Sequence, residues 1–270
     1  MDTNNQNLIY TNGNSDKAQT YLDIQAEVGI SKHFGGFRAT DILHNRCSLS
    51  RSSDVLEVGC GTGAGSIYIA NKYGCKVDAV DISEKMLFWA RKRADQEEVK
   101  NQIHFQKADI LKLPFENDRF DVVLVESVLA FVDDKTSAIE ELIRVTKPGG
   151  YLGLNEYSWI SEPLSEVLSK SVFLGMATIT KSAWEDIWEK TQLVDRTIEH
   201  FLVEPRQEFK DRIKWVGGWI AIFQVWSRVI KLLLRYPGAR DAIKQQIDIP
   251  TDISQAMGYS LLTGRKPEKM

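Results

Sequence analysis

The sequence predicts an α/β fold in which a mainly parallel, doubly wound sheet carries helices on both faces. Short apolar segments alternate with segments of helical periodicity from about residue 54 to residue 155. The first apolar segment runs directly into a glycine-rich turn and then into a helix. Acidic residues follow later apolar segments at Asp81, Asp109 and Glu126. An open parallel sheet binds its ligand at the carboxyl ends of its strands, so these three side chains predict a site at that edge.

Length and composition favour one α/β domain with insertions. The 270 residues exceed the usual single-domain size but fall short of two ordinary domains, so we expect residues 17–270 to form one unit. The Asn-rich residues 1–16 have neither a basic start nor a long apolar run, which predicts a disordered tail and no signal peptide. With 43% hydrophobic and 26% charged residues, the composition is that of a soluble globular protein.

Charge and cysteine content narrow the function classes. The net charge of -3 gives no electrostatic reason to expect a nucleic-acid partner. The three cysteines are odd in number and lack paired C-x-x-C spacing, which argues against a disulfide framework and against a zinc site. We therefore expect a cytoplasmic protein without a metal centre or a transmembrane segment.

The glycine-rich turn predicts a nucleotide-like ligand. Residues 54–58 have the branched, apolar character of a strand buried on both faces, and three alternating glycines then let the backbone turn tightly. The helix expected over 64–73 would present its first amides and a partial positive charge to the same space. Gly59, Gly61 and Ala64 also satisfy the relaxed G-x-G-x-x-G/A fingerprint, so spacing alone leaves a dinucleotide open.

The next two strands place carboxylates in register with this turn. Residues 76–81 read as a strand ending in Asp81, and Ser83 and Glu84 then start a helix. Asp81 stands about 20 residues after the glycine turn, where a carboxylate accepts from ribose hydroxyls in several nucleotide sites; a helix cap is the plainer alternative. A strand over 103–107 is followed by Asp109.

Two further strands complete this half of the chain. Residues 120–125 are almost continuously apolar and are closed by Glu126. A helix capped by Asp133 or Asp134 leads to a Lys-Pro-Gly-Gly turn at 147–150 and a fifth strand over 151–155. We expect Glu156 and Tyr157 to fall just beyond this strand, where they would face a substrate, unless Glu156 only caps the next turn.

The segment Glu-Val-Gly-Cys-Gly-Thr-Gly at 57–63 resembles the first motif of the class I S-adenosylmethionine (SAM)-dependent methyltransferases of small-molecule type. The resemblance implies a seven-stranded Rossmann-like sheet with SAM as cofactor. It implies that Asp109 accepts from the adenine amino group, that Ile110 packs on the ring and that Glu126 lines the methionine end. The cofactor-binding residues that it implies are Glu57, Gly59, Cys60, Gly61, Gly63, Asp81, Ile82, Met86, Asp109, Ile110 and Glu126. The absence of an Asn/Asp-Pro-Pro-Tyr motif removes the amide and adenine N-methyltransferases.

The implied reaction is in-line transfer of the SAM methyl group to a small, largely apolar acceptor. A protonated acceptor needs a base, for which the candidates are Glu126, Glu156 and His33. His33 precedes a Gly35-Gly36 break, and in the family N-terminal helices cover the cofactor mouth; the alternative is a surface turn with the glycines as a helix stop.

Two other functions stay open at this point. An NAD(P)-dependent oxidoreductase would use the glycine turn and Asp81, but it leaves Glu57 and the Asp109-Ile110 pair unexplained. A SAM-binding, non-catalytic partner subunit would keep the pocket and transfer nothing. The sequence leaves the acceptor and the oligomeric state open.

The C-terminal half predicts two helical insertions, about 158–180 and 206–250, around a resumed core. The first contains a helix over 163–175, and a capping box at Ser182 starts the helix that follows it. Strands are expected over 194–203 and 257–264.

The apolar periodicity of residues 215–233 predicts one amphipathic helix. Arg228 and Lys231 interrupt it too early for a membrane span, so the plain interpretation is a core helix of the insertion. We hypothesise that its aromatic face, with Trp219 and Trp226, also roofs the acceptor pocket. Docking on a membrane surface is the rival, and the roof hypothesis expects no binding to liposomes.

Overall fold

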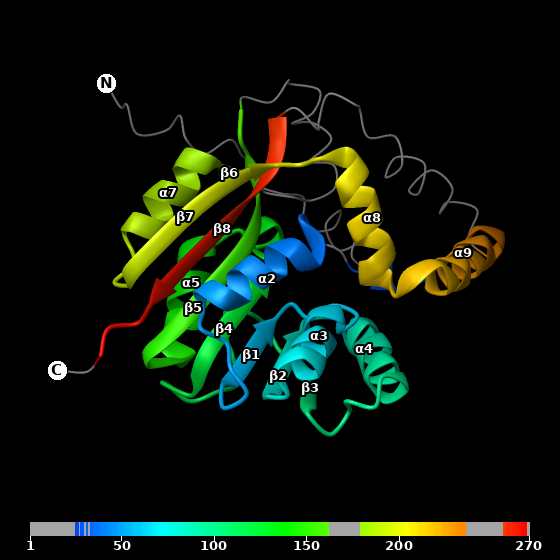
Figure 1. Ribbon diagram of the computed structural model, residues 1–270, viewed down its shortest axis with the longest axis horizontal. Coiled ribbons are helices and arrows are strands. Elements are labelled where there is room, and N and C mark those ends of the chain that lie inside the picture. The colour runs from blue at the N-terminus through cyan, green and yellow to red at the C-terminus, as the bar shows by residue number, and fades with distance from the viewer. Residues whose placement is uncertain are drawn as a thin grey trace.

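A computed structural model describes residues 33–161, 179–235 and 256–268, together with Gln25, Ala26, Val28, Gly29 and Ser31. Its strands form one sheet in the order β3-β2-β1-β4-β5-β8-β7, with the short β6 paired to β5 (Figure 1). The strands are β1 (Asp54–Val58), β2 (Lys76–Asp81), β3 (Ile103–Lys107), β4 (Phe120–Glu126), β5 (Thr146–Trp159), β6 (Ile179–Thr180), β7 (Val194–Leu202) and β8 (Met257–Arg265). Pairing is parallel from β3 to β5, and β8 is antiparallel to both β5 and β7. The predicted doubly wound, mainly parallel sheet is confirmed.

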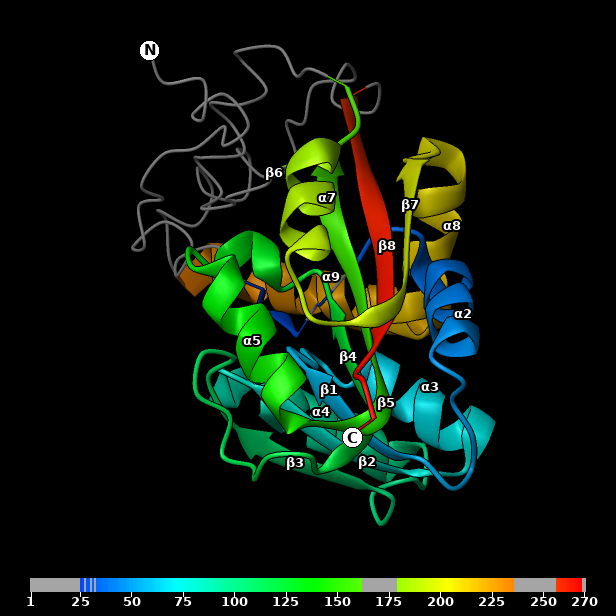
Figure 2. The ribbon, with the colours of Figure 1, turned by 90° about the vertical axis from the view of Figure 1, so that its left-hand side faces the viewer.

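Helices cover both faces of this sheet, and Figure 2 shows α5 and α7 on one side with α2 and α3 on the other. The helices are α2 (Gly36–Arg46), α3 (Ala64–Tyr73), α4 (Glu84–Gln96), the short 3-10 turn η1 (Leu129–Phe131), α5 (Lys135–Val145), α7 (Lys181–Glu189), α8 (Pro205–Val216) and α9 (Gly218–Arg235). Two buried clusters fill the layers. Val122 and Leu124 pack under α2, α3 and α4, whereas Val123 and Val125 pack under α5 and α7. The alternation of strand side chains thus explains the continuous apolar run that the sequence shows.

Strand β5 is longer at both ends than the sequence predicts. It begins at Thr146, so the Lys-Pro-Gly-Gly segment lies within the strand, beside a register shift between Phe120 and Val122. It continues to Trp159 because antiparallel β8 keeps pairing with it beyond the last β4 contact at Asn155. Glu156 therefore lies inside the strand, opposite Ser260, and the prediction that it follows the strand end is wrong.

Two predictions about helices need correction, and two other predictions fall outside the described residues. Helix α7 is capped by Thr180, which accepts from the Ala183 amide, and not by Ser182. The single helix expected over 215–233 is two helices, because Gly217 adopts a left-handed φ of 105° and ends α8 before α9 begins. The helix expected over 163–175 and the tail expected over 1–16 lie outside the described residues.

Candidate active site

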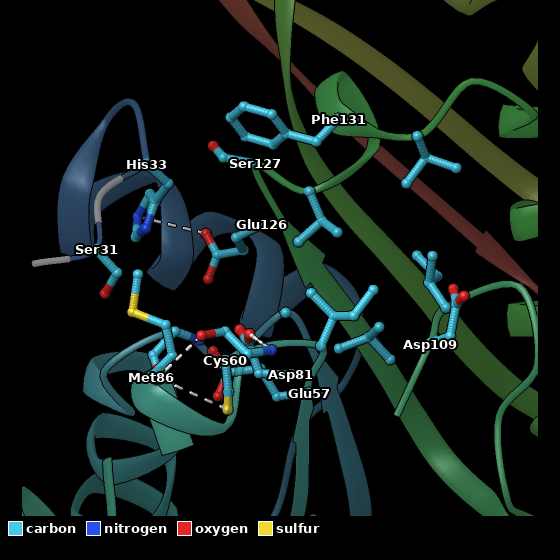
Figure 3. A pocket seen from close by; sticks show the side chains of 18 of the residues that line it. Ser31, His33, Glu57, Cys60, Asp81, Met86, Asp109, Glu126, Ser127 and Phe131 are labelled. Carbon is cyan, nitrogen blue, oxygen red and sulfur yellow. Dashed lines mark hydrogen bonds and ion pairs between the residues drawn. The ribbon is translucent and has the colours of Figure 1, made fainter. Parts of the chain in front are cut away.

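A cavity of about 500 Å³ opens at the carboxyl ends of β1, β2 and β4 (Figure 3). One part of it borders the glycine turn and the start of α4, and another borders the segment before α2, η1 and the end of α8. Its lining includes Gln25, Ser31, His33, Glu57, Val58, Gly59, Cys60, Gly61, Asp81, Ile82, Ser83, Met86, Ala108, Asp109, Ile110, Leu111, Glu126, Ser127, Val128, Phe131, Val132, Asp133, Asp134, Tyr157 and Trp215. Nearly all the predicted cofactor residues meet here, and its size is that of a small-molecule site.

Gly59 and Gly61 are required by the shape of the turn. Both have positive φ, 75° and 53°, and a Cβ on Gly59 would lie 2.1 Å from Cγ2 of Val128. A Cβ on Gly61 would lie 2.6 Å from Cβ of Ser31. Gly63 serves another purpose, because it packs against Ala90 of α4 and is absent from the cavity lining. Gly63 is thus the one predicted cofactor residue that the structure does not bring to the cavity.

The amides of the glycine turn are already paired within the protein. Those of Gly59 and Cys60 donate to the Val80 carbonyl at 2.7 and 3.0 Å, and the Gly61 amide donates to Asp81 at 2.8 Å. Thr62 donates to the Ser31 hydroxyl at 3.2 Å. These four amides are therefore not free to donate to a ligand.

The Glu57 carboxylate occupies the start of α3, where the first amides of the helix would otherwise face a ligand. It accepts hydrogen bonds from both the hydroxyl and the amide of Ser66 in the first turn of that helix. A pyrophosphate placed on these amides would have to displace two buried carboxylates, those of Glu57 and Asp81. This arrangement argues against a dinucleotide and in favour of a ligand that carries positive charge.

The charge of the lining points the same way. Six carboxylates border the cavity, and none of the described lining residues is Lys or Arg. Burial raises the pKa of Glu57 to about 8, and burial also raises the pKa of Asp81. A cationic ligand would stabilise the charged form of both groups. SAM carries a sulfonium and an ammonium group, so the residues present fit it.

Asp81 combines the two roles that the sequence left open. It accepts from the Ser83 amide at 2.8 Å and thereby shapes the start of α4, while it also lines the cavity. A carboxylate has about four acceptor positions, so two remain for ribose hydroxyls. Beyond it the wall becomes apolar at Ile82, Met86 and Ile110, and Asp109 accepts from the Leu111 amide at 3.0 Å. This wall suits a flat aromatic base.

His33 and Glu126 meet at the opposite wall of the cavity (Figure 3). Nε2 of His33 lies 3.4 Å from Oε2 of Glu126, and both side chains are almost fully buried. The Glu126 carboxylate also accepts from the Thr40 hydroxyl at 3.0 and 3.1 Å and from the Asn155 amide at 3.0 Å. The pair is thus held in one orientation, and the alternative of His33 as a surface turn residue is wrong.

The surroundings of His33 assign its ring nitrogens. Nε2 faces three acceptors: the Gly36 carbonyl at 3.2 Å, the Thr40 hydroxyl oxygen at 3.1 Å and Glu126. This nitrogen therefore carries the proton, and in the neutral ring Nδ1 holds the lone pair. The Trp215 ring packs edge-on at 4.0 Å and limits rotation of the imidazole. The arrangement can accept a proton and stabilise the resulting charge.

Glu156 has a structural position. It is fully buried, is absent from the cavity lining, and accepts through Oε1 from the Val128 and Leu129 amides at 3.0 Å each. It therefore caps η1, the turn after β4, and its geometry does not suit the predicted role as base. Its neighbour Tyr157 does line the cavity, as predicted.

Several lining and supporting residues escaped the sequence analysis. Thr40 carries no local signal, because only the packing of α2 on the sheet brings it to Glu126. Asn155 ends a predicted strand next to the strand of Glu126, a pattern that could have identified it. Among the described residues no cluster of three His, Cys, Asp or Glu could hold a metal ion, and no helix is long and apolar enough to cross a membrane.

Methyltransferases are among the known proteins that this chain resembles in sequence. A family profile described as "Methyltransferase domain" matches residues 56–154. An uncharacterized protein of Haemophilus influenzae is 33% identical over 58% of this chain and 64% of its own length. Methyltransferase GfsG of Streptomyces halstedii is 33% identical over 44% of this chain and 43% of its own length. The 27-O-demethylrifamycin SV methyltransferase of Amycolatopsis mediterranei is 32% identical over 47% of this chain and 46% of its own length. The chain spans less than two thirds of the length of these relatives.

Solved structures share the fold. The [4+2]-cyclase SpnF superposes with a TM-score of 0.72 at 20% identity, over 95% of this chain and 96% of its own. Phosphoethanolamine N-methyltransferase 2 of Haemonchus contortus, bound to S-adenosylhomocysteine, superposes with a TM-score of 0.69 at 19% identity, over 93% and 58%. The cyclase shows that this fold supports more than one reaction. Residues 56–154 thus match a methyltransferase domain, and the profile, the relatives and the fold together support a class I SAM-dependent methyltransferase with S-adenosylmethionine as its cofactor.

Proposed function

We propose that this protein transfers the methyl group of SAM to a hydroxyl of a small, largely apolar acceptor, with His33 as the base. The observation that carries the proposal is the buried pair of His33 and Glu126 in the wall of the same cavity that Glu57 and Asp81 border. A cofactor site and a proton acceptor thus share one enclosed space.

The cofactor half of the cavity provides binding and orientation. SAM supplies a methyl group that its sulfonium already activates, so the protein contributes mainly alignment and exclusion of water. Asp81 would accept from the ribose, Glu57 would neutralise positive charge, and Ile82, Met86 and Ile110 would enclose the base. Asp109 would accept from the adenine amino group.

The acceptor half would remove the proton. Nδ1 of His33 would take the hydroxyl proton as the oxygen attacks the methyl carbon, and the imidazolium formed would be stabilised by Glu126 at 3.4 Å from Nε2. Thr40 and Asn155 hold Glu126 in place, so the charge partner needs no reorganisation during the reaction.

The lining supports an uncharged, apolar acceptor. Besides Trp215, which packs on His33, the cavity lining includes the apolar or aromatic side chains of Val128, Phe131, Val132 and Tyr157. No described lining residue is Lys or Arg, so these residues offer no counter-charge for a phosphorylated acceptor. The 27-O-demethyl substrate in the name of the Amycolatopsis relative is consistent with transfer to oxygen.

The test combines a histidine exchange with a matched control. His33→Gln and His104→Gln remove the same group, but His104 lies on β3, is largely exposed and is absent from the cavity lining. Methyl-labelled SAM is offered with a panel of phenols, apolar alcohols, amines and phosphorylated alcohols. We expect His33→Gln to lower kcat by about 10²–10⁴-fold and to flatten the pH profile of the reaction, with unchanged affinity for S-adenosylhomocysteine. His104→Gln should behave as wild type.

Other outcomes would redirect the proposal. Normal turnover by His33→Gln would remove His33 as the base. Tight binding of S-adenosylhomocysteine without transfer to any acceptor would favour the non-catalytic partner subunit. Transfer to phosphorylated acceptors alone would overturn the apolar acceptor.

A further inference from the structure

Helix α9 presents an apolar stripe to solvent. Trp219, Phe223, Trp226, Ile230 and Leu234 are between 54% and 76% exposed, and they recur at intervals of three or four residues. Such spacing places them along one side of the helix. Val225, on the opposite side, is 8% exposed and faces the rest of the protein. Figure 1 shows α9 extending away from the sheet.

This stripe does not roof the acceptor pocket, so that hypothesis is wrong. Neither Trp219 nor Trp226 lines the cavity, and they are 68% and 56% exposed. Trp215 does line the cavity. It lies near the end of α8, and the break at Gly217 separates it from α9, which continues in another direction. The stripe is too large and too regular to be scattered surface residues, which indicates a docking face.

The charges around the stripe indicate what docks there. Helices α8 and α9 contain seven Lys or Arg and two Asp or Glu, and α9 has no acidic residue, although the whole chain carries -3. Two of these cations are exposed, Lys231 next to Ile230 on α9 and Lys214 near the end of α8. A second copy docking through the same face would oppose like charges, whereas an anionic surface would be complementary.

The anchoring of α9 leaves the stripe free to make contact. Arg228 stacks 4.5 Å from the Trp89 ring of α4 and donates to the Val28 carbonyl at 2.6 Å. Arg93 of α4 donates to the Trp215 carbonyl at 3.0 Å, which fixes the end of α8. The helix is therefore held by its polar side on α4, and its apolar side faces outward.

We propose that α9 docks this protein on the surface of an anionic lipid bilayer, with the helix lying in the plane of the interface. Tryptophan and phenylalanine side chains favour the boundary between headgroups and acyl chains, and flanking cations are attracted to anionic headgroups. No helix in the described part of the chain could span the bilayer, which fits docking on one surface. The docking is independent of the methyl acceptor.

The experiment is co-sedimentation of the full chain with vesicles of phosphatidylcholine, with or without roughly one third phosphatidylglycerol. We expect binding to the anionic vesicles, weakening as salt is raised, and little binding to phosphatidylcholine alone. Trp219→Ala combined with Trp226→Ala should reduce the partition coefficient roughly tenfold or more. Lys231→Glu should weaken binding only to the anionic vesicles. Leu202→Ala is the matched control, since Leu202 is 54% exposed on β7, away from α9.

Three outcomes would overturn the proposal. They are failure of the wild type to sediment with anionic vesicles, equal sedimentation of the double variant, and a dimer in light scattering that the double variant loses. Each variant is also titrated with S-adenosylhomocysteine. Unchanged affinity shows that the site is intact, so loss of docking is distinguishable from failure of the proposed function.

Discussion

Replacing Asp81 by Ala tests the cofactor site and the glycine turn together. Asp81 accepts the Gly61 and Ser83 amides at 2.8 Å each, and its side chain is almost fully buried. Hydrogen bonds to a charged group contribute about 1.5–3 kcal/mol each, so the pair would stabilise the fold by about 3–6 kcal/mol. Burial raises the pKa of Asp81, which means that desolvation offsets part of this gain. We expect the free energy of unfolding to fall by about 3 kcal/mol.

The same change should weaken cofactor binding. Two bonds from ribose hydroxyls to the carboxylate, at about 1.5–3 kcal/mol each, correspond to a loss of roughly 10²–10⁴-fold in affinity. Urea unfolding measures the first effect, and calorimetric titration of the folded variant with S-adenosylhomocysteine measures the second.

Asp78→Ala provides the control on the same strand. Asp78 pairs with the exposed His104 at 2.9 Å and is absent from the cavity lining, so its loss should cost less than about 1 kcal/mol and leave affinity unchanged. If Asp81→Ala were as stable as Asp78→Ala and bound S-adenosylhomocysteine equally well, the assignment of Asp81 would be refuted.

Three further predictions concern a buried histidine, a buried carboxyl and the glycine turn. His44 is fully buried with neither ring nitrogen hydrogen-bonded among the described residues, and desolvation lowers its pKa to about 4. The unfolded chain protonates the His44 ring below about pH 6.5, whereas the folded chain does so only near pH 4, so on the order of 3 kcal/mol of stability should be lost as pH falls from 6.5 to 4. The stability of His44→Leu should therefore depend less on acid than that of wild type. An unchanged dependence would refute the assignment. Burial raises the pKa of Glu156 to about 7, so between about pH 4.5 and pH 7 the folded state holds a proton that the unfolded state has released. Stability therefore falls as the pH rises from about 4.5 to 7 and then levels off. The melting temperature of Glu156→Gln, relative to that of wild type, should rise as the pH is raised from 5 to 8. A difference between the two melting temperatures that stays constant over this range would contradict the assigned pKa. Gly61→Val should abolish binding of S-adenosylhomocysteine, because its Cβ would meet Ser31 at 2.6 Å and φ is 53°; retained affinity would show that the turn tolerates a side chain.

The parallel half of the fold could be predicted from sequence because its signals are local. The strand of residues 54–58, the glycine turn and Asp81 lie within one strand–helix–strand unit, where periodicity and spacing determine the structure. The cavity edge followed from the rule that strand ends gather at one side of a parallel sheet.

The acceptor half could not be predicted in the same way. His33, Glu126 and Trp215 are far apart in the chain and meet only because α2 and α8 pack over the sheet edge. Glu156 was misplaced because the length of β5 depends on pairing with β8, about a hundred residues later. The α9 stripe was interpreted as buried because periodicity shows that one side of a helix is apolar, not which way that side faces.

The central claim is that the cavity binds SAM through Glu57 and Asp81 and rejects dinucleotides because these carboxylates occupy the donors that a pyrophosphate would need. Calorimetric titration of the wild type with S-adenosylhomocysteine, and separately with NADH and NADPH, tests it most directly. We predict saturable binding of S-adenosylhomocysteine at one site per chain and no heat of binding from either dinucleotide. Binding of a dinucleotide without binding of S-adenosylhomocysteine would contradict the account.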